Sequence, residues 1–272
     1  MFKEWGGYGD AFAEDVPYEE IKPDYKQAYW DIGFGLQKID GLEPSGYLVE
    51  LAKKQVAGEL THEELMAYLT EYHAAGAKFG ESEEADFTSA RIAKILAEDG
   101  FSFRPVTLLH YHKEIFGGIE SFPYLVGEYR TMDMGKKEPI LNGESVRYAS
   151  ANMIHSTLKY DFEEEIERNY RGMSREEIAH QVMKFISRIW QVHPFREGNT
   201  RTISTFAIKY LREFGFEIDN EPFKNHAKYL RNAFVLDNAS SASKRTDKYL
   251  RMFTENIVLG GKNELVILQN VE

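Results

Sequence analysis

Residues 193–201 read His-Pro-Phe-Arg-Glu-Gly-Asn-Thr-Arg, and this stretch decides the fold. It lies between two segments with apolar residues at helical spacing, so it predicts a short loop that joins two buried helices. Its residue types suit the handling of a phosphate group. A histidine can accept a proton near neutral pH, a glutamate can bind a hard divalent cation, and a Gly-Asn turn that opens a helix presents free N–H groups to an anion.

Helices are expected on both sides of this loop. Ser174 and Glu177 have the spacing of a capping box, at the start of a helix that Pro194 ends, which leaves His193 at its C-terminal edge. The next helix begins near Asn199. The same signals predict further helices at about 24–39, 45–57, 61–72, 88–99, 105–116, 150–170, 222–236 and 246–258. The fold class is therefore expected to be all-α.

The length and composition predict one compact body with an appendage. A chain of 272 residues with 43% apolar residues can build a large core. No internal repeat or long linker interrupts it. We expect an N-terminal helical segment over residues 1–78, of which the first 23 form a loop over the body, and a larger domain over residues 79–272.

Several classes of protein are disfavoured by composition. The chain has no cysteine, which excludes disulfides and thiolate metal sites. It shows neither a leader nor a long apolar run, so we expect a cytoplasmic protein without membrane segments. The formal net charge is −11, from 33 basic and 44 acidic residues, which disfavours binding to nucleic acid or anionic lipid. The expected partner is a protein or a small molecule.

The nine-residue loop resembles the signature of the Fic family, HPFx[D/E]GN[G/K]R, at every fixed position except Thr200. The resemblance implies a Fic-type helical bundle and an adenylyltransferase, which moves AMP from Mg·ATP to a Ser, Thr or Tyr hydroxyl of a target protein. It implies that His193 is the base and Glu197 the Mg²⁺ ligand. It implies nucleotide contacts from the rest of the loop and from a late helix, namely Phe195, Arg196, Gly198, Asn199, Thr200, Arg201, Tyr229 and Asn232. Phe195 is also expected to anchor the loop in the core, and a packing role is equally open for Tyr229 and Asn232.

The stretch from Gly127 to Arg147 interrupts the helical pattern and is expected to form an exposed β-hairpin. Its first residues, Gly127-Glu128-Tyr129-Arg130-Thr131, resemble the start of the flap of Fic proteins. The resemblance implies that a target protein docks on this flap by edge pairing, which tolerates many sequences. An incidental surface hairpin is the alternative. Fic domains often self-associate, so a homo-oligomer is also open.

The N-terminal segment resembles the small antitoxin of some toxin–antitoxin pairs, here fused to its Fic toxin. In Fic proteins the inhibitory motif [S/T]xxxE[G/N] pairs its glutamate with a second arginine, three residues after the first. Here the motif has Leu36 and Asp40, and Ser204 stands where the second arginine is expected. We therefore expect Asp40 to lack a cationic partner, and the segment to stabilise the core with some steric blocking. Ser204 also removes a usual contact to the outer phosphate of ATP.

Two other functions remain open. Doc-like relatives transfer a terminal phosphate, although they favour Lys at the position of Thr200. A nucleotide-binding interaction module with weakened catalysis is the second alternative, because the second arginine is missing.

Overall fold

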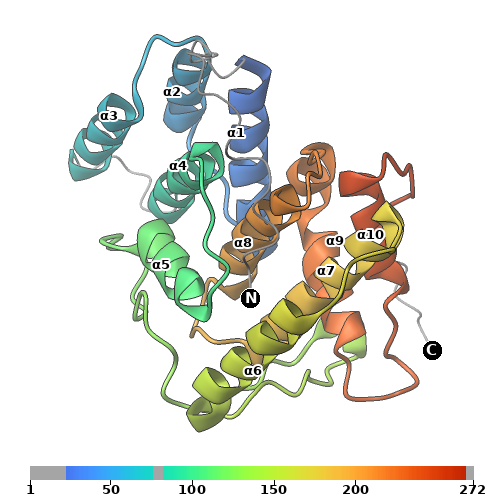
Figure 1. Cartoon of the computed structure of the whole chain (residues 1–272). Helices are drawn as coiled ribbons and strands as arrows, with labels where there is room; N and C mark the ends of the chain where they lie inside the picture. The colour runs from blue at the N-terminus through green and yellow to red at the C-terminus, as the bar shows by residue number, and fades with distance from the viewer. Residues whose placement is uncertain (1–22, 76–81, 268–272) are drawn as a thin grey trace.

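The computed structural model describes residues 23–75 and 82–267. Within these ranges the chain forms ten α-helices and no strand (Figure 1), which confirms the predicted all-α class. None of the described helices is long and apolar enough to cross a bilayer. The loop predicted over the first residues and the predicted boundary at residue 78 lie outside the described residues.

Most of the helices follow one another with short connections, but a long irregular stretch joins α5 to α6. They are α1 (Pro23–Gln37), α2 (Gly46–Val56), α3 (His62–Ala74), α4 (Glu83–Ala97), α5 (Pro105–Phe116), α6 (Ile154–Glu167), α7 (Arg175–Val192), α8 (Asn199–Glu213), α9 (Glu221–Asp237) and α10 (Lys248–Val258). Short 3-10 turns occur at Lys38–Asp40, Pro139–Leu141 and Ala151–Met153.

Local signals in the sequence set most of the helix starts. The Ser174 side chain accepts a hydrogen bond from the Glu177 N–H, and the Glu177 carboxylate accepts one from the Ser174 N–H, which makes the predicted capping box. Thr61 and Glu64 form the same box at α3. The prediction was wrong for α4, which begins at Glu83 and not near Thr88. Acidic residues in its first turn favour the earlier start, because they face the positive end of the helix dipole.

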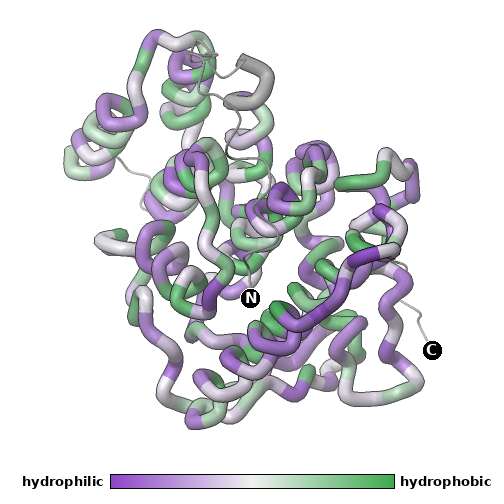
Figure 2. The backbone as a smooth tube through the Cα atoms, viewed as in Figure 1, coloured by the Kyte–Doolittle hydropathy of each residue, from purple (hydrophilic) through white to green (hydrophobic). Residues whose placement is uncertain are grey.

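Helix α8 lies in the middle of the molecule, between α1 and α7 in Figure 1. All of its residues from Asn199 to Leu211 are buried. Apolar and polar stretches alternate along the surrounding helices (Figure 2), and the apolar ones pack on α8. The rings of Phe162, Phe185 and Phe206 meet in this core, and burial of each contributes about 1.5 to 3 kcal/mol. The signature loop is thus attached to a rigid element.

The N-terminal helix α1 is part of the same core. It packs against α4 and α9, and its Trp30 and Leu36 side chains are almost fully buried. Gly35 lies directly against the backbone of Phe223, where any side chain would clash. Removing α1 would therefore expose core residues of the rest of the protein.

The stretch from Gly127 to Arg147 does not form the predicted β-hairpin. It turns back on itself through a few hydrogen bonds, including Glu138 N–H to Glu144 O at 2.9 Å, without a ladder of paired strands. Pro139 lacks an N–H donor, and Asn142 and Gly143 have positive φ values of 56° and 86°, which suits a tight turn and not a strand. An isolated antiparallel bridge joins Val146 to Ala239.

Candidate active site

The signature loop is held in one conformation by its own residues. His193 ends α7 with φ 52°, and Gly198 opens α8 with φ 78°. A side chain at Gly198 would lie 2.5 Å from the Phe116 ring, so only glycine fits. The Asn199 side chain accepts a hydrogen bond from the Phe195 N–H at 2.9 Å and donates one to the Phe195 carbonyl at 2.8 Å. These contacts fix the loop between the two helices.

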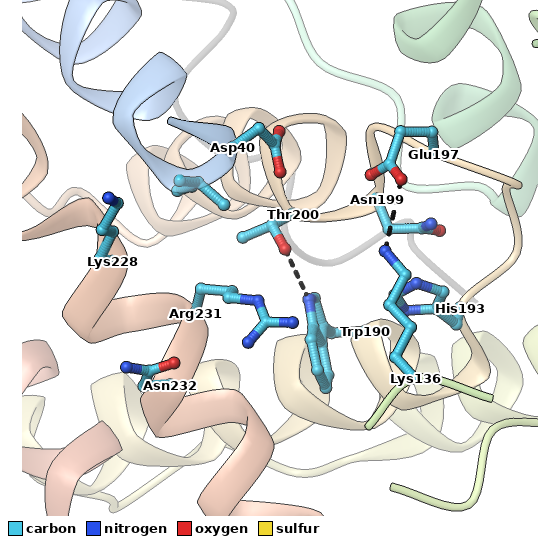
Figure 3. A pocket seen from close by; sticks show the side chains of 11 residues that line it. Asp40, Lys136, Trp190, His193, Glu197, Asn199, Thr200, Lys228, Arg231 and Asn232 are labelled. Carbon is cyan, nitrogen blue, oxygen red and sulfur yellow. Dashed lines mark hydrogen bonds and ion pairs between the residues drawn. The ribbon is translucent and has the colours of Figure 1, made fainter. Parts of the chain in front are cut away.

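The loop opens into a cavity of about 220 Å³ (Figure 3). The cavity is lined by the signature loop and the start of α8, by the 3-10 turn after α1, by the stretch before α6, and by α7 and α9. The lining residues are Ile39, Asp40, Lys136, Trp190, His193, Glu197, Asn199, Thr200, Lys228, Arg231 and Asn232. The structure therefore brings together five of the predicted site residues, which are His193, Glu197, Asn199, Thr200 and Asn232.

His193 has the properties of a base. Its ring stacks on Tyr148 at 4.1 Å, and neither ring nitrogen has a hydrogen-bond partner among the described residues. Burial lowers the pKa of His193 well below its usual value, and the charges of Lys136 and Arg130 lower it further. The imidazole is therefore neutral at pH 7, and neither nitrogen is engaged by another described residue.

Glu197 presents a carboxylate at the edge of the cavity. Its Oε1 accepts a hydrogen bond from the Gly198 N–H at 3.1 Å, and its Oε2 lies 3.4 Å from the Lys136 ammonium. The side chain is 30% exposed, so it can also reach a solvated ion. A carboxylate at the edge of a cavity is a ligand that fits Mg²⁺, which is commonly held by one or two carboxylates and substrate phosphates.

Three cationic residues make the cavity suitable for an anion. Lys136 comes from the loop before α6, and Lys228 and Arg231 come from α9 (Figure 3). Arg231 is fixed by a bidentate ion pair with Glu138, with distances of 2.6 and 2.9 Å. The N-terminus of α8, whose dipole also favours anions, lies on the same side.

Arg201 does not line the cavity. Its guanidinium is fully buried, donates to Gln37 Oε1 at 3.1 Å and to Glu84 Oε1 at 2.6 Å, and forms an ion pair with Asp40 at 3.0 Å. The expectation that Asp40 lacks a cationic partner is therefore wrong. Arg201 turns toward the N-terminal segment and supplies the cation that Ser204, itself fully buried, cannot supply.

Four more of the predicted nucleotide contacts do not line the cavity, and one of them is Gly198 at the start of α8. Phe195 is buried and stacks on His112 with ring centroids 3.9 Å apart, as expected of an anchor. Arg196 is exposed. Tyr229 is 5% exposed and packs in the core against Tyr249 and Phe253, which is the packing role that the sequence left open.

Sequence reasoning missed two residues that hold the loop. His112 lies close to Glu197 O through its Nε2, at 3.1 Å, and accepts a hydrogen bond from the Gly127 N–H through Nδ1, at 2.9 Å. Arg130 donates from Nε to the His193 carbonyl at 2.9 Å. Arg130 carried one usable signal, because it falls in the run from Gly127 to Thr131 that resembles the start of the Fic flap. His112 carried no such signal, because its position matched an ordinary helix face.

Part of the chain is similar to a known protein family. Residues 102–211 match the sequence model of the Fic/DOC family. The chain is 27% identical over 108 residues to protein adenylyltransferase VbhT of Bartonella schoenbuchensis. That match covers 40% of this chain and 21% of the relative, so the chain spans about a fifth of the relative's length.

Solved structures share the fold. The N-terminal Fic domain of a Bartonella effector protein from Bartonella sp. AR 15-3 has a TM-score of 0.53 and 20% identity, over 66% of this chain and 82% of that chain. A second VirB-translocated effector, from Bartonella sp. 1-1C, has a TM-score of 0.50 and 20% identity, over 64% and 82%. At this level of identity the likeness shows the fold alone.

Proposed function

We propose that this chain is a protein adenylyltransferase, since residues 102–211 match the sequence model of the Fic/DOC family. It would transfer AMP from ATP to a hydroxyl side chain of a target protein. The observation that supports this most is the neutral, unpartnered imidazole of His193 in a cavity that also holds Glu197 and three cations.

In this proposal His193 accepts the proton of the attacking hydroxyl. The hydroxyl oxygen bonds to the α-phosphorus, the bond from that phosphorus to the bridging oxygen breaks, and pyrophosphate leaves. A base that is neutral and correctly placed typically contributes about 10²- to 10⁴-fold in rate. The Tyr148 ring and the Arg130 hydrogen bond to the His193 carbonyl keep the imidazole facing the cavity.

The remaining residues would bind and neutralise the phosphates. Lys136, Lys228 and Arg231 attract the anion, and the N–H groups at the start of α8 can donate to it. Glu197 would hold Mg²⁺, which offsets phosphate charge when bound. Glu197 could bind the ion without a rearrangement of the loop, because the contact of its Oε2 with a described residue is the one to the Lys136 ammonium, at 3.4 Å.

The N-terminal segment would limit access for the nucleotide. Ile39 and Asp40 form part of the cavity wall, and about 220 Å³ is less than the roughly 300 to 1,000 Å³ typical of ligand pockets. The Asp40 carboxylate also repels a triphosphate. We infer that ATP binding requires this turn to move outward, which would free Arg201 for the phosphates.

The target protein would dock near the irregular loop of residues 127–147. Met132 in this loop is 66% exposed, and Leu125 just before it is 60% exposed, which offers apolar contact on the stretch that also contributes Lys136 to the cavity.

Labelled ATP tests the proposed reaction. A lysate is incubated with the protein and with ATP that carries label on either the α or the γ phosphate. AMP transfer predicts protein-bound label from α-labelled ATP alone, and its loss with His193→Ala. Label from the γ position would instead indicate a phosphotransferase, and ATP binding without any transfer would indicate an interaction module.

A further inference from the structure

A second cluster of chemically reactive side chains lies far from the signature loop. Glu176 and His180, one turn apart on α7, share a helix face with each other and meet Glu255 of α10. One ligand atom from each of the three residues lies within 4.8 Å of the others. The cluster is near the start of α7, about 20 Å along the helix from His193 at its end.

His180 is the unusual member of the cluster. Its side chain is 9% exposed, and its Nε2 has no hydrogen-bond partner within the described part of the chain. The Glu255 Oε1 atom lies 3.7 Å from Nε2, which is too long for a hydrogen bond. A buried polar atom left without a partner costs about 1 to 3 kcal/mol, so such an atom calls for an explanation.

Neighbouring residues fix the position of the Glu255 side chain beside His180. Asn263 Nδ2 donates to Glu255 Oε2 at 2.7 Å, and the Asn263 backbone N–H is fixed by the Asn256 side chain at 2.8 Å. One carboxylate oxygen is thus occupied by a neutral donor while the other faces the imidazole. Neighbours that orient a ligating carboxylate in this way are typical of metal sites.

We propose that Glu176, His180 and Glu255 bind a divalent transition-metal ion that fastens α10 to α7. One imidazole and two carboxylates form a set of nitrogen and oxygen ligands that suits Zn²⁺ and its neighbours in the first transition row. Two carboxylate charges offset the charge of the ion. The ion gives His180 Nε2 the partner that it lacks, and solvent can complete the coordination because Glu176 is exposed.

Arg251 competes with the ion in the present arrangement. Its Nη1 lies 3.1 Å from His180 Nδ1, and because a guanidinium only donates, Nδ1 accepts and the ring proton is on Nε2. Metal binding at Nε2 requires that proton to be on Nδ1, so Arg251 must withdraw. The withdrawal is inexpensive, since the Arg251 side chain is 52% exposed and keeps Asp247 as a partner at 2.8 Å.

Calorimetric titration of the whole chain with Zn²⁺ tests the proposal. The wild type is compared with His180→Ala and with Glu255→Gln, which preserves the shape of the side chain. His110→Ala is the matched control, because His110 forms an exposed contact with Glu114 one helical turn away but has no second glutamate ligand. Glu197→Gln removes the carboxylate of the candidate active-site cavity. Any Zn²⁺ that binds at Glu197 is therefore lost in this variant and can be told apart from Zn²⁺ at the second cluster.

The expected result is one equivalent of Zn²⁺ in the wild type, in His110→Ala and in Glu197→Gln, weakened at least about tenfold in His180→Ala and Glu255→Gln. Zn²⁺ at about 100 times its Kd should raise Tm by roughly 5 °C in the wild type, His110→Ala and Glu197→Gln, but not in the other two variants. Arg251→Ala should bind Zn²⁺ more tightly than the wild type. Equal affinity in wild type, folded His180→Ala and folded Glu255→Gln would overturn the proposal, whether or not the protein transfers AMP.

Discussion

Asp40 of the N-terminal segment forms an ion pair with Arg201 in the first turn of α8, with 3.0 Å between Oδ2 and Nε. The contact lacks the geometry of a good hydrogen bond at Nε, but Glu84 and Gln37 complete the surroundings of the guanidinium. Burial raises the pKa of Asp40, although Arg201 opposes that rise. The charge of the signature arginine is thus neutralised inside the protein and is not offered to the cavity.

Asp40→Asn should activate the proposed transferase. The substitution preserves the shape of the side chain, removes a negative charge from the cavity wall and leaves Arg201 with Glu84 as its one close carboxylate. We expect the rate of AMP transfer to rise several-fold and the KM for ATP to fall, as measured with α-labelled ATP. Asp31→Asn is the matched control, because Asp31 joins α1 to Asn220, the residue before α9, and forms no ion pair with Arg201 among the described residues. Equal activation by both substitutions would mean that loosening α1, and not freeing Arg201, is responsible.

Glu197→Gln should weaken the dependence on magnesium. The amide keeps the size of the side chain but loses the negative charge that would hold Mg²⁺. We expect transfer to fall by about 10² at low Mg²⁺ and to recover partly at high Mg²⁺, while the unfolding midpoint changes little because the side chain is 30% exposed. Glu217→Gln, an exposed glutamate outside the cavity, should behave as wild type. A magnesium profile identical to wild type would remove Glu197 from the proposed metal site.

Gly198→Ala should destabilise the protein more than its backbone strain alone explains. The new methyl group would lie 2.5 Å from the Phe116 ring at φ 78°, so both strain and overlap arise. We expect a loss of about 2 to 4 kcal/mol in the free energy of unfolding, measured with urea. Gly172→Ala is the control for strain, since φ there is 82° with open space around the position, and it should cost only about 1 kcal/mol. Equal losses for the two substitutions would show that the contact with Phe116 is unimportant.

Stability should fall in mild acid because of His112. Burial lowers the pKa of His112 to about 4, so the unfolded chain, with a histidine pKa near 6.5, binds the proton more readily. The loss of stability that comes from this difference in proton binding is therefore absent above pH 6.5. As pH falls from 6.5 to about 4, the free energy of unfolding should decrease by on the order of 3 kcal/mol from this residue.

His112→Phe isolates that effect. Phenylalanine can still stack on Phe195, but it cannot titrate or accept the Gly127 hydrogen bond. Urea unfolding between pH 7 and pH 4.5 should show a less stable protein whose stability depends less on pH than that of the wild type. Some pH dependence will remain, because burial also lowers the pKa of His193 and, to about 4, that of His62. A slope unchanged from wild type would contradict the role given to His112.

The sequence predicted those features that depend on neighbouring residues. The capping box at Ser174, the helix end at His193 and the start of α8 at Asn199 are each set within a few positions, so periodicity and capping rules were enough. The cavity residues of the signature loop were found for the same reason, since they are contiguous.

Features that depend on contacts between distant segments could not be predicted in this way. The partner of Asp40 is Arg201, and the partner of His112 is the backbone of Glu197, and both contacts join segments far apart in the sequence. The expected hairpin was wrong because two short mixed runs on either side of Gly135 suggested strands, whereas a ladder of paired donors and acceptors does not form there.

The central proposal is tested most directly by the transfer of label from α-labelled ATP to protein, measured with His193 present and with His193 replaced by alanine. Asp40→Asn, the expected activated form, and the double variant Asp40→Asn/His193→Ala are incubated with the same lysate, Mg²⁺ and α-labelled ATP, after circular dichroism shows that both are folded. The proposal predicts labelled protein with the first variant and a loss of about 10² or more with the second. Equal labelling by both, or none by the first at saturating ATP, would contradict it.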